Sequence, residues 1–269
     1  MAGLSINQAW NETAAFFRQE ARLVLPVSFM LIALPATLLG LAVPETAPNE
    51  RPPAGAWMAL LPLVLAVTLI GQMAISYLAI RPNVSVGEAL ARGARRAGPM
   101  FAALLLVGLG FGVLLIVVSI FAALLIPGAL PEPGAGAGAP SAAASLVLLL
   151  LLAPMIYVGI RLLLANAVAA AEDVGPVGIL KRSWALTRGR SWKLLGLMAA
   201  VVVLAVVIGL AVQTVLGSVL ILFAGRPEPG SIGFVLLLIV GAVLHTIVAA
   251  LVAILLARIY AQVQPTSGI

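Results

Sequence analysis

The chain contains no cysteine, a single histidine (His245) and a single aspartate (Asp173) among its 269 residues. Without cysteine it has no disulfide, no thiolate nucleophile and no cysteine-ligated metal. One histidine and one aspartate leave almost nothing for acid–base or metal chemistry, so we expect no cofactor, no metal site and no enzymatic activity. Charged residues are scarce as well, at 9%, against about 25% in soluble domains. These absences exclude a soluble enzyme and a secreted disulfide scaffold.

Most of the chain is apolar. They make up 63% of the chain, and the mean hydropathy is +1.20. A membrane-spanning helix needs about 20 mostly apolar residues. We therefore predict an all-α, polytopic bundle of six transmembrane helices, with spans at about 23–43, 56–80, 100–126, 145–170, 194–223 and 233–257. Together they form one domain over residues 23–269.

Lysine and arginine lie mostly on one side of these spans. Of the 15 basic residues, Arg51 and Arg226 lie in loops on the other side and Arg161 lies within a span. Because cytoplasmic loops carry the excess of basic residues, both termini are predicted to be cytoplasmic. A pI near 10.8 would suit nucleic-acid binding, but the basic residues border apolar spans. That placement favours membrane lipids, anionic phospholipid above all, as partners instead of nucleic acid.

Residues 1–22 precede the first span and read as an N-terminal interfacial helix. Ser5 followed by Gln8 is a capping-box pattern that begins a helix. Trp10 and Phe17 fall on one face, with Arg18 and Arg22 opposite, as in helices that lie on a bilayer surface. A plain amphipathic leader to the first span is the alternative interpretation.

Two basic cytoplasmic amphipathic helices are predicted, one before the third span and one over 176–190. The second carries Lys181, Arg182 and Arg188 on its polar margin, and we consider these residues candidate ligands of lipid headgroups. The alternative is that the basic residues only orient the chain. Glu172 and Asp173 precede this helix and are expected to cap its N-terminus.

Arg161 is the most informative residue because a charge inside a span is costly unless it is paired or solvated. Gln72, Tyr157 and Asn166 are predicted to lie near its depth and to form with it a polar pocket for an anion or a lipid phosphate. A structural arginine bonded to neighbouring helices is the alternative. His245 is the other intramembrane polar candidate, either hydrogen-bonded across helices or part of a transport path.

Gly108 and Gly112 have the Gly-x-x-x-Gly spacing that lets membrane helices approach closely. Packing within the chain is the first interpretation of this spacing, and a homo-oligomer is the second.

The segment from Arg161 through Glu172 and Gly175-Pro176 to the run KRSWALTRG at 181–189 resembles a known signature. It is similar to the glycerophosphoryl diester phosphodiesterase membrane-domain superfamily and to YciC-type bacterial inner-membrane proteins. The resemblance implies a six-helix domain in a bacterial inner membrane. Some relatives carry a fused phosphodiesterase domain, for which this chain has no room, so that activity is not implied.

The sequence therefore predicts a non-enzymatic, multi-pass inner-membrane protein that acts on or through lipid, as an envelope or lipid-handling factor. Two alternatives stay open. One is a small-solute permease that uses a polar layer of Gln72, Arg161 and His245. The other is a structural or assembly subunit of a membrane complex.

Overall fold

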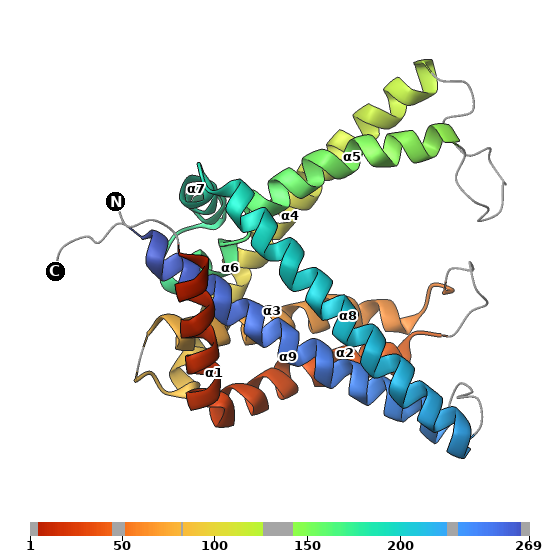
Figure 1. Ribbon diagram of the computed structural model, residues 1–269. Helices are drawn as coiled ribbons and strands as arrows, with labels where there is room; N and C mark the ends of the chain where they lie inside the picture. The colour runs from red at the N-terminus through yellow and green to blue at the C-terminus, as the bar shows by residue number, and fades with distance from the viewer. Residues whose placement is uncertain (1–4, 45–51, 82, 126–141, 225–230, 265–269) are drawn as a thin grey trace.

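The computed structural model describes residues 5–44, 52–81, 83–125, 142–224 and 231–264, and no strand occurs in these ranges. Six helical segments of the described chain are long and apolar enough to cross a membrane. The predicted all-α fold with six spans is confirmed. In chain order the helices are α1 Ile6–Ser28, α2 Leu34–Ala42, α3 Leu60–Ile80, α4 Val86–Leu125, α5 Ala142–Arg161, α6 Ala165–Ala171, α7 Pro176–Thr187, α8 Ser191–Ala224 and α9 Ile232–Val263 (Figure 1).

The N-terminal segment and the first span form one helical run with a turn in it. The Ser5 side chain accepts a hydrogen bond from the Gln8 backbone N–H at 3.3 Å, which confirms the predicted N-cap. Pro26 lies inside α1, and a π-helical turn over Phe29–Ala33 joins α1 to α2. Proline and π-helical turns are established causes of helix kinks. The run accordingly changes direction between α1 and α2 (Figure 1).

The first basic segment is continuous with the third span. Helix α4 extends without interruption from Val86 to Leu125 and includes Pro99. Gly93 lets it pack closely on α3, because a Cβ at this position would lie 2.7 Å from the carbonyl oxygen of Ile70. The arginines on either side of Gly93 are therefore held beside other helices of the bundle.

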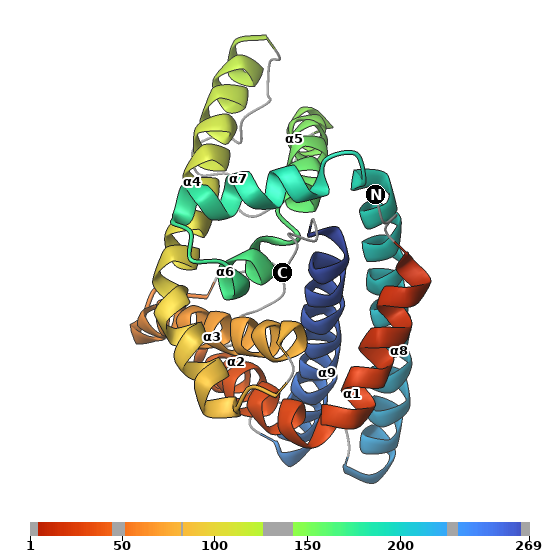
Figure 2. The ribbon, with the colours of Figure 1, turned by 90° about the vertical axis from the view of Figure 1, so that its left-hand side faces the viewer.

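The fourth span is interrupted. Helix α5 ends at Arg161, a turn follows, and the short helix α6 begins at Ala165. Almost every side chain of α6 is buried. In Figure 2, α7 extends across this end of the molecule from α4 toward α8, in front of α5.

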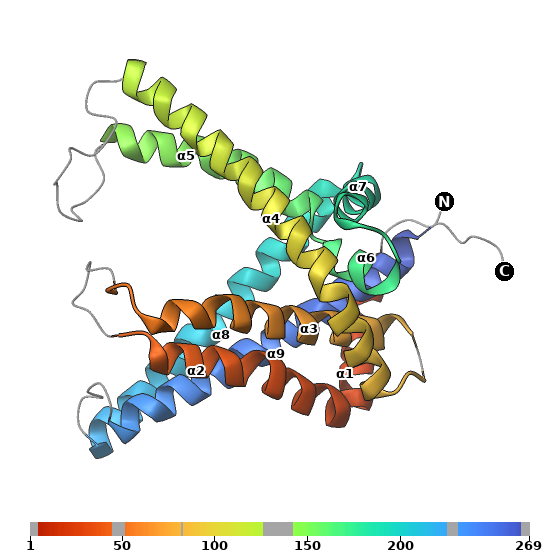
Figure 3. The same ribbon diagram turned by 180° about the vertical axis from the view of Figure 1, so that it is seen from behind.

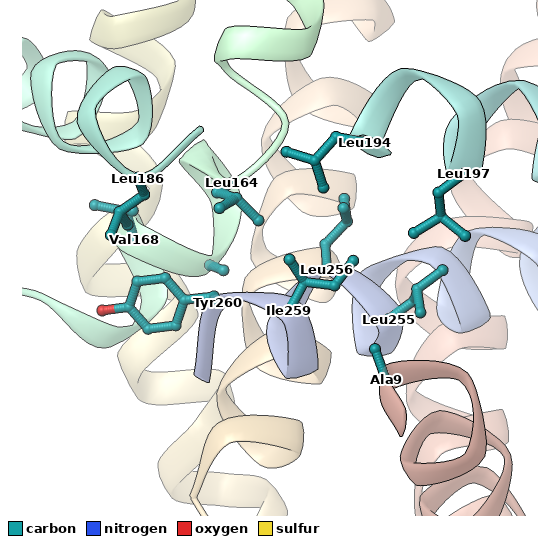
Figure 4. Packing of buried hydrophobic residues seen from close by; sticks show 11 residues of the cluster. Ala9, Leu164, Val168, Leu186, Leu194, Leu197, Leu255, Leu256, Ile259 and Tyr260 are labelled. Atoms are coloured by element: carbon teal, nitrogen blue, oxygen red, sulfur yellow. The ribbon is translucent and has the colours of Figure 1, made fainter. Parts of the chain in front are cut away.

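The largest cluster of buried side chains surrounds α6. Leu164 and Val168 pack there against Leu186 of α7 and against Ile259 and Tyr260 of α9. Figure 4 shows these residues converging from α6, α7 and α9, together with Leu194 and Leu197 of α8 and Ala9 of α1. The start of α1 and the end of α9 lie at the same end of the molecule as α6 and α7 (Figure 1). The buried core therefore lies where the basic residues gather.

At the opposite end, α4 and α5 diverge as a pair from α2, α3, α8 and α9 (Figures 1 and 3). None of the most apolar window of α4 is buried. A Cβ added to Gly108 or Gly112 would meet nothing within 4 Å. The prediction that these glycines pack within the chain is wrong, because neither of them faces a neighbouring helix of the described chain at close range.

Candidate functional site

The break after Arg161 is stabilised by α7. The Arg161 carbonyl oxygen accepts hydrogen bonds from Ser183 Oγ at 2.9 Å and Thr187 Oγ1 at 3.2 Å. Both hydroxyl-bearing residues are buried. Helix ends leave carbonyl groups without intrahelical partners, and these groups need donors where water is scarce. Helix α7 therefore supplies side-chain donors to the end of α5.

The Arg161 guanidinium lies between two aromatic rings. Its Cζ is 5.1 Å from the centroid of the Tyr157 ring and 5.3 Å from that of the Trp184 ring. Both distances are within the range of cation–π attraction. Arg161 Nη2 also donates a hydrogen bond to Tyr157 Oη at 2.9 Å. Tyr157, a predicted site residue, thus contacts Arg161 directly, and Trp184 of α7 is a contact that the site prediction did not include.

Two nitrogen atoms of this guanidinium have no acceptor. Arg161 Nε and Nη1 are buried, and neither forms a hydrogen bond within the part of the chain that the structure describes. A buried donor without a partner costs about 1–3 kcal/mol. Arg161 is therefore a positive group with unused hydrogen-bonding capacity at the end of a membrane helix.

Gln72 and Asn166 form a separate polar pair. Asn166 Nδ2 of α6 donates to Gln72 Oε1 of α3 at 2.8 Å. Among the described residues no hydrogen bond joins this pair to Arg161. The structure therefore brings Gln72 and Asn166 together and places Arg161 with Tyr157, in two groups instead of one pocket.

His245 lies apart from both the Arg161–Tyr157 group and the Gln72–Asn166 pair. It lines a cavity of about 440 Å³ between α8 and α9, where its neighbours include Gln213 and Gly241. Gln72, Arg161 and His245, which the permease hypothesis placed in one layer, each have different neighbours. Within the described ranges, no three histidine, aspartate or glutamate side chains gather as a metal site would need.

The three predicted basic ligands on α7 have different surroundings. Arg182 Nε donates to Glu172 Oε1 at 3.0 Å and is engaged in an ion pair. Lys181 and Arg188 are exposed. Only these two leave their charge available at the surface.

The acidic residues before α7 do not cap it, so that prediction is wrong. The N-cap of α7 is Gly175, without a side-chain hydrogen bond. Glu172 turns instead toward α7 and α9, where its Oε1 accepts from Arg182, Tyr260 and Gln264. Glu172 therefore links α7 to α9, which are distant in the sequence, and does not act as a cap of α7.

Arg92 and Arg96 were not among the predicted site residues. They lie one turn apart on α4 and reach the C-terminal end of α6. Arg92 Nε donates to the Ala170 carbonyl and Arg96 Nε to the Ala169 carbonyl, each at 3.0 Å. Cations are favourable at helix C-termini, where carbonyl groups carry partial negative charge. The i, i+4 spacing of the two arginines places them on one face of α4, but it does not indicate their partners.

Arg92 also pairs with Asp173, with 2.7 Å between Arg92 Nη1 and Asp173 Oδ1. The hydrogen bond from Arg92 holds the pKa of the Asp173 carboxyl below its ordinary value, and the charges of Arg92, Arg96 and Arg95 act in the same direction. Burial opposes this shift. The carboxylate is therefore stabilised in its charged form.

This lowered pKa predicts a pH dependence of stability. A carboxyl whose pKa is depressed by folding stabilises the protein above its unfolded-state pKa, about 3.9, and this contribution is lost as the pH falls through the folded-state pKa. We expect Asp173→Asn to lower Tm slightly at pH 7, because the carboxylate is exposed. The difference in Tm between wild type and variant should decrease as the pH falls below about 3.9. A difference that stays constant from pH 7 to pH 3 would contradict the assignment.

A family model described as a domain of unknown function (DUF7847) matches residues 4–263 of the chain. No curated protein and no solved structure matches it.

Proposed function

Since the chain belongs to the DUF7847 family, whose description names no activity, we propose its function from its own side chains. We propose a lipid-binding membrane protein that holds the phosphate of an anionic phospholipid at Arg161. The proposed role includes no enzymatic step. The proposed setting is a bacterial inner membrane with both termini in the cytoplasm, and a relationship to the glycerophosphoryl diester phosphodiesterase membrane domains and YciC-type proteins is part of the same proposal.

The observation that carries this proposal is the pair of unsatisfied donors on Arg161, Nε and Nη1. Nε–H lies on the edge that it shares with Nη2, and Nη1 lies at the other end of the planar guanidinium, so each is a separate donor for a charge-assisted hydrogen bond to a phosphate oxygen. Nη2 is already engaged with Tyr157. One nitrogen of the group is thus held in place while the other two are left as donors for an anion.

The side chains that flank the Arg161 guanidinium are two aromatic rings, those of Tyr157 and Trp184. Tyr157 is 48% exposed and Trp184 is 38% exposed, so both rings border the lipid or the interface. A rotamer change of an exposed ring takes nanoseconds and requires no helix movement. A phosphate that approaches from the leaflet therefore reaches the guanidinium when a ring moves aside.

The surroundings favour an anionic lipid. Lys181 and Arg188 are exposed on the same segment that contributes Trp184. Basic residues near an anionic leaflet each add roughly 1 kcal/mol of attraction. A permease would need a shared path for Gln72, Arg161 and His245, and their separate neighbours support lipid binding over transport. No observation favours the assembly-subunit alternative in particular.

Native mass spectrometry of the purified protein with equal phosphatidylglycerol and phosphatidylethanolamine tests the proposal. Arg161→Gln should weaken phosphatidylglycerol binding by about tenfold or more, because charge-assisted hydrogen bonds contribute about 1.5–3 kcal/mol. Arg161→Lys should have an intermediate affinity, since lysine keeps the charge but lacks the fork.

Arg188→Gln is the matched control, because it removes the same charge from an exposed position and should lose only the general attraction to an anionic leaflet, roughly 1 kcal/mol. If Arg161→Gln and Arg188→Gln retain the same amount of phosphatidylglycerol, Arg161 is not the ligand and the proposed function is wrong.

A further inference from the structure

A second cavity, of about 470 Å³, lies on the opposite side of the core between α1, the end of α3 and the segment that leads to α4. Its polar lining includes Glu20, Arg81, Asn83 and Ser85, and its apolar lining includes Phe16 and Leu23. Figure 3 shows α1, the end of α3 and the start of α4 together at the end of the molecule that holds α6 and α7. The cavity is therefore at the level of the cytoplasmic headgroups in the predicted orientation.

Two residues of opposite charge line this cavity without forming an ion pair with each other. Glu20 and Arg81 both line it, yet the ion pairs of the described residues join only Arg92 or Arg96 to Asp173 and Arg182 to Glu172. The other two polar residues of the lining, Asn83 and Ser85, lie in the segment that precedes α4. Ser85 Oγ accepts from the Glu88 N–H at the start of α4, and Asn83 adopts a left-handed backbone conformation, with φ 66°.

We propose that this cavity binds the headgroup of a zwitterionic phospholipid that carries a primary ammonium, such as phosphatidylethanolamine. Arg81 binds the phosphate, and Glu20 accepts hydrogen bonds from the ammonium. Leu23 of α1 extends the apolar surface along which the acyl chains pass into the bilayer.

The carboxylate determines the selectivity. An anionic headgroup such as phosphoglycerol gains the contact with Arg81 but places a hydroxyl beside Glu20 and keeps its full negative charge near that carboxylate. A primary ammonium cancels this repulsion and donates up to three hydrogen bonds, which are stronger when both partners are charged. A quaternary choline ammonium cancels the charge but donates none.

Phe16, in the apolar lining of the cavity, forms a cation–π contact with Arg258 of α9. The Arg258 guanidinium of α9 lies 5.1 Å from the centroid of the Phe16 ring. The Phe16 ring therefore lines the cavity and also contacts a residue of α9. This site shares no residue with Arg161 and is independent of the function proposed there.

Titration of the delipidated full-length protein with phosphatidylethanolamine, phosphatidylcholine and phosphatidylglycerol of identical acyl chains, followed by native mass spectrometry, tests this site. We expect wild type to bind phosphatidylethanolamine more tightly than phosphatidylcholine. Glu20→Gln should weaken phosphatidylethanolamine binding about tenfold and should raise phosphatidylglycerol binding. That gain is a readout that an unfolded variant would not produce. Arg81→Gln should weaken all three lipids, and Arg81→Lys should restore them in part.

Glu12→Gln is the matched control, because it removes the same charge from another position on α1, where the Glu12 side chain accepts a hydrogen bond from Gln8 and does not line the cavity. Arg161→Gln should leave phosphatidylethanolamine binding unchanged, which separates this site from the one proposed above. The proposal is overturned if Glu20→Gln leaves the order of the three lipids as in wild type. It is equally overturned if Glu12→Gln changes that order as much as Glu20→Gln does.

Discussion

Replacing Arg96 with Met is expected to lower the free energy of unfolding by at least about 1–3 kcal/mol, because the buried Ala169 carbonyl loses a donor and the partly buried Val174 carbonyl loses another. The residue is only 9% exposed. Its Nε donates to the Ala169 carbonyl and its Nη2 to the Val174 carbonyl. The Ala169 carbonyl lies in the last turn of α6 and the Val174 carbonyl lies in the connection to α7, so the Arg96 side chain supplies the donors that water would supply at an exposed helix end. Methionine fills a similar volume but donates nothing.

Arg95→Met is the matched control on the neighbouring position. Arg95 is exposed, and its Nε donates to the Ala91 carbonyl of its own helix. Surface substitutions of this kind change stability by less than about 0.5 kcal/mol. Thermal unfolding in detergent, followed by circular dichroism, compares the two variants with wild type. Equal Tm values for Arg96→Met and Arg95→Met would show that the carbonyl contacts do not stabilise the fold.

Arg96→Lys separates charge from geometry. A lysine ammonium keeps the positive charge beside the end of α6 but is a compact group without the planar fork. It reaches one of the two carbonyls and not both. We therefore expect a Tm between those of wild type and Arg96→Met, whereas a purely electrostatic role would give a Tm close to wild type.

The spans were predictable because each is specified by its own residues. Twenty apolar residues cross a bilayer whatever they contact, and the second membrane-spanning segment, Ala56–Ile80, coincides with the predicted range 56–80. The break after Arg161 was not predictable in this way, since residues 145–170 are apolar on both sides of it. It depends on Ser183 and Thr187, which donate to the Arg161 carbonyl from a helix that comes later in the chain.

In the candidate site, too, some features could be predicted from local residues and others depend on contacts with distant parts of the chain. A charge inside a span marked Arg161, and Tyr157 was predictable as a neighbour one turn earlier on the same helix. The roles of Arg92 and Arg96 were not, because their partners are backbone carbonyls of α6. Every residue has such a carbonyl, so the sequence carries no sign of which ones need a donor. Only the packing of α4 on α3 at Gly93 directs these arginines away from lipid.

Replacing Glu172 with Ala is expected to lower the free energy of unfolding by about 2–3 kcal/mol, as hydrogen bonds to charged groups contribute about 1.5–3 kcal/mol and exposed ion pairs little. Glu172 Oε1 accepts from Tyr260 Oη at 2.8 Å and from Arg182 Nε at 3.0 Å. The Arg182 side chain is 40% exposed, so most of the loss comes from Tyr260, which is fully buried.

A double-mutant cycle tests this attribution. Tyr260→Phe removes the hydroxyl but keeps the ring that packs against Leu186 and Val168. If the hydroxyl–carboxylate contact is the main interaction, Glu172→Ala should cost much less in the Tyr260→Phe background than in wild type, with a coupling energy of about 1–2 kcal/mol. The cycle of Glu172→Ala with Arg182→Ala should give a smaller coupling, because that pair is partly solvated. Additive losses in the first cycle would mean that Glu172 acts through Arg182 or Gln264, and the link between the α6–α7 connection and α9 would then not depend on Tyr260.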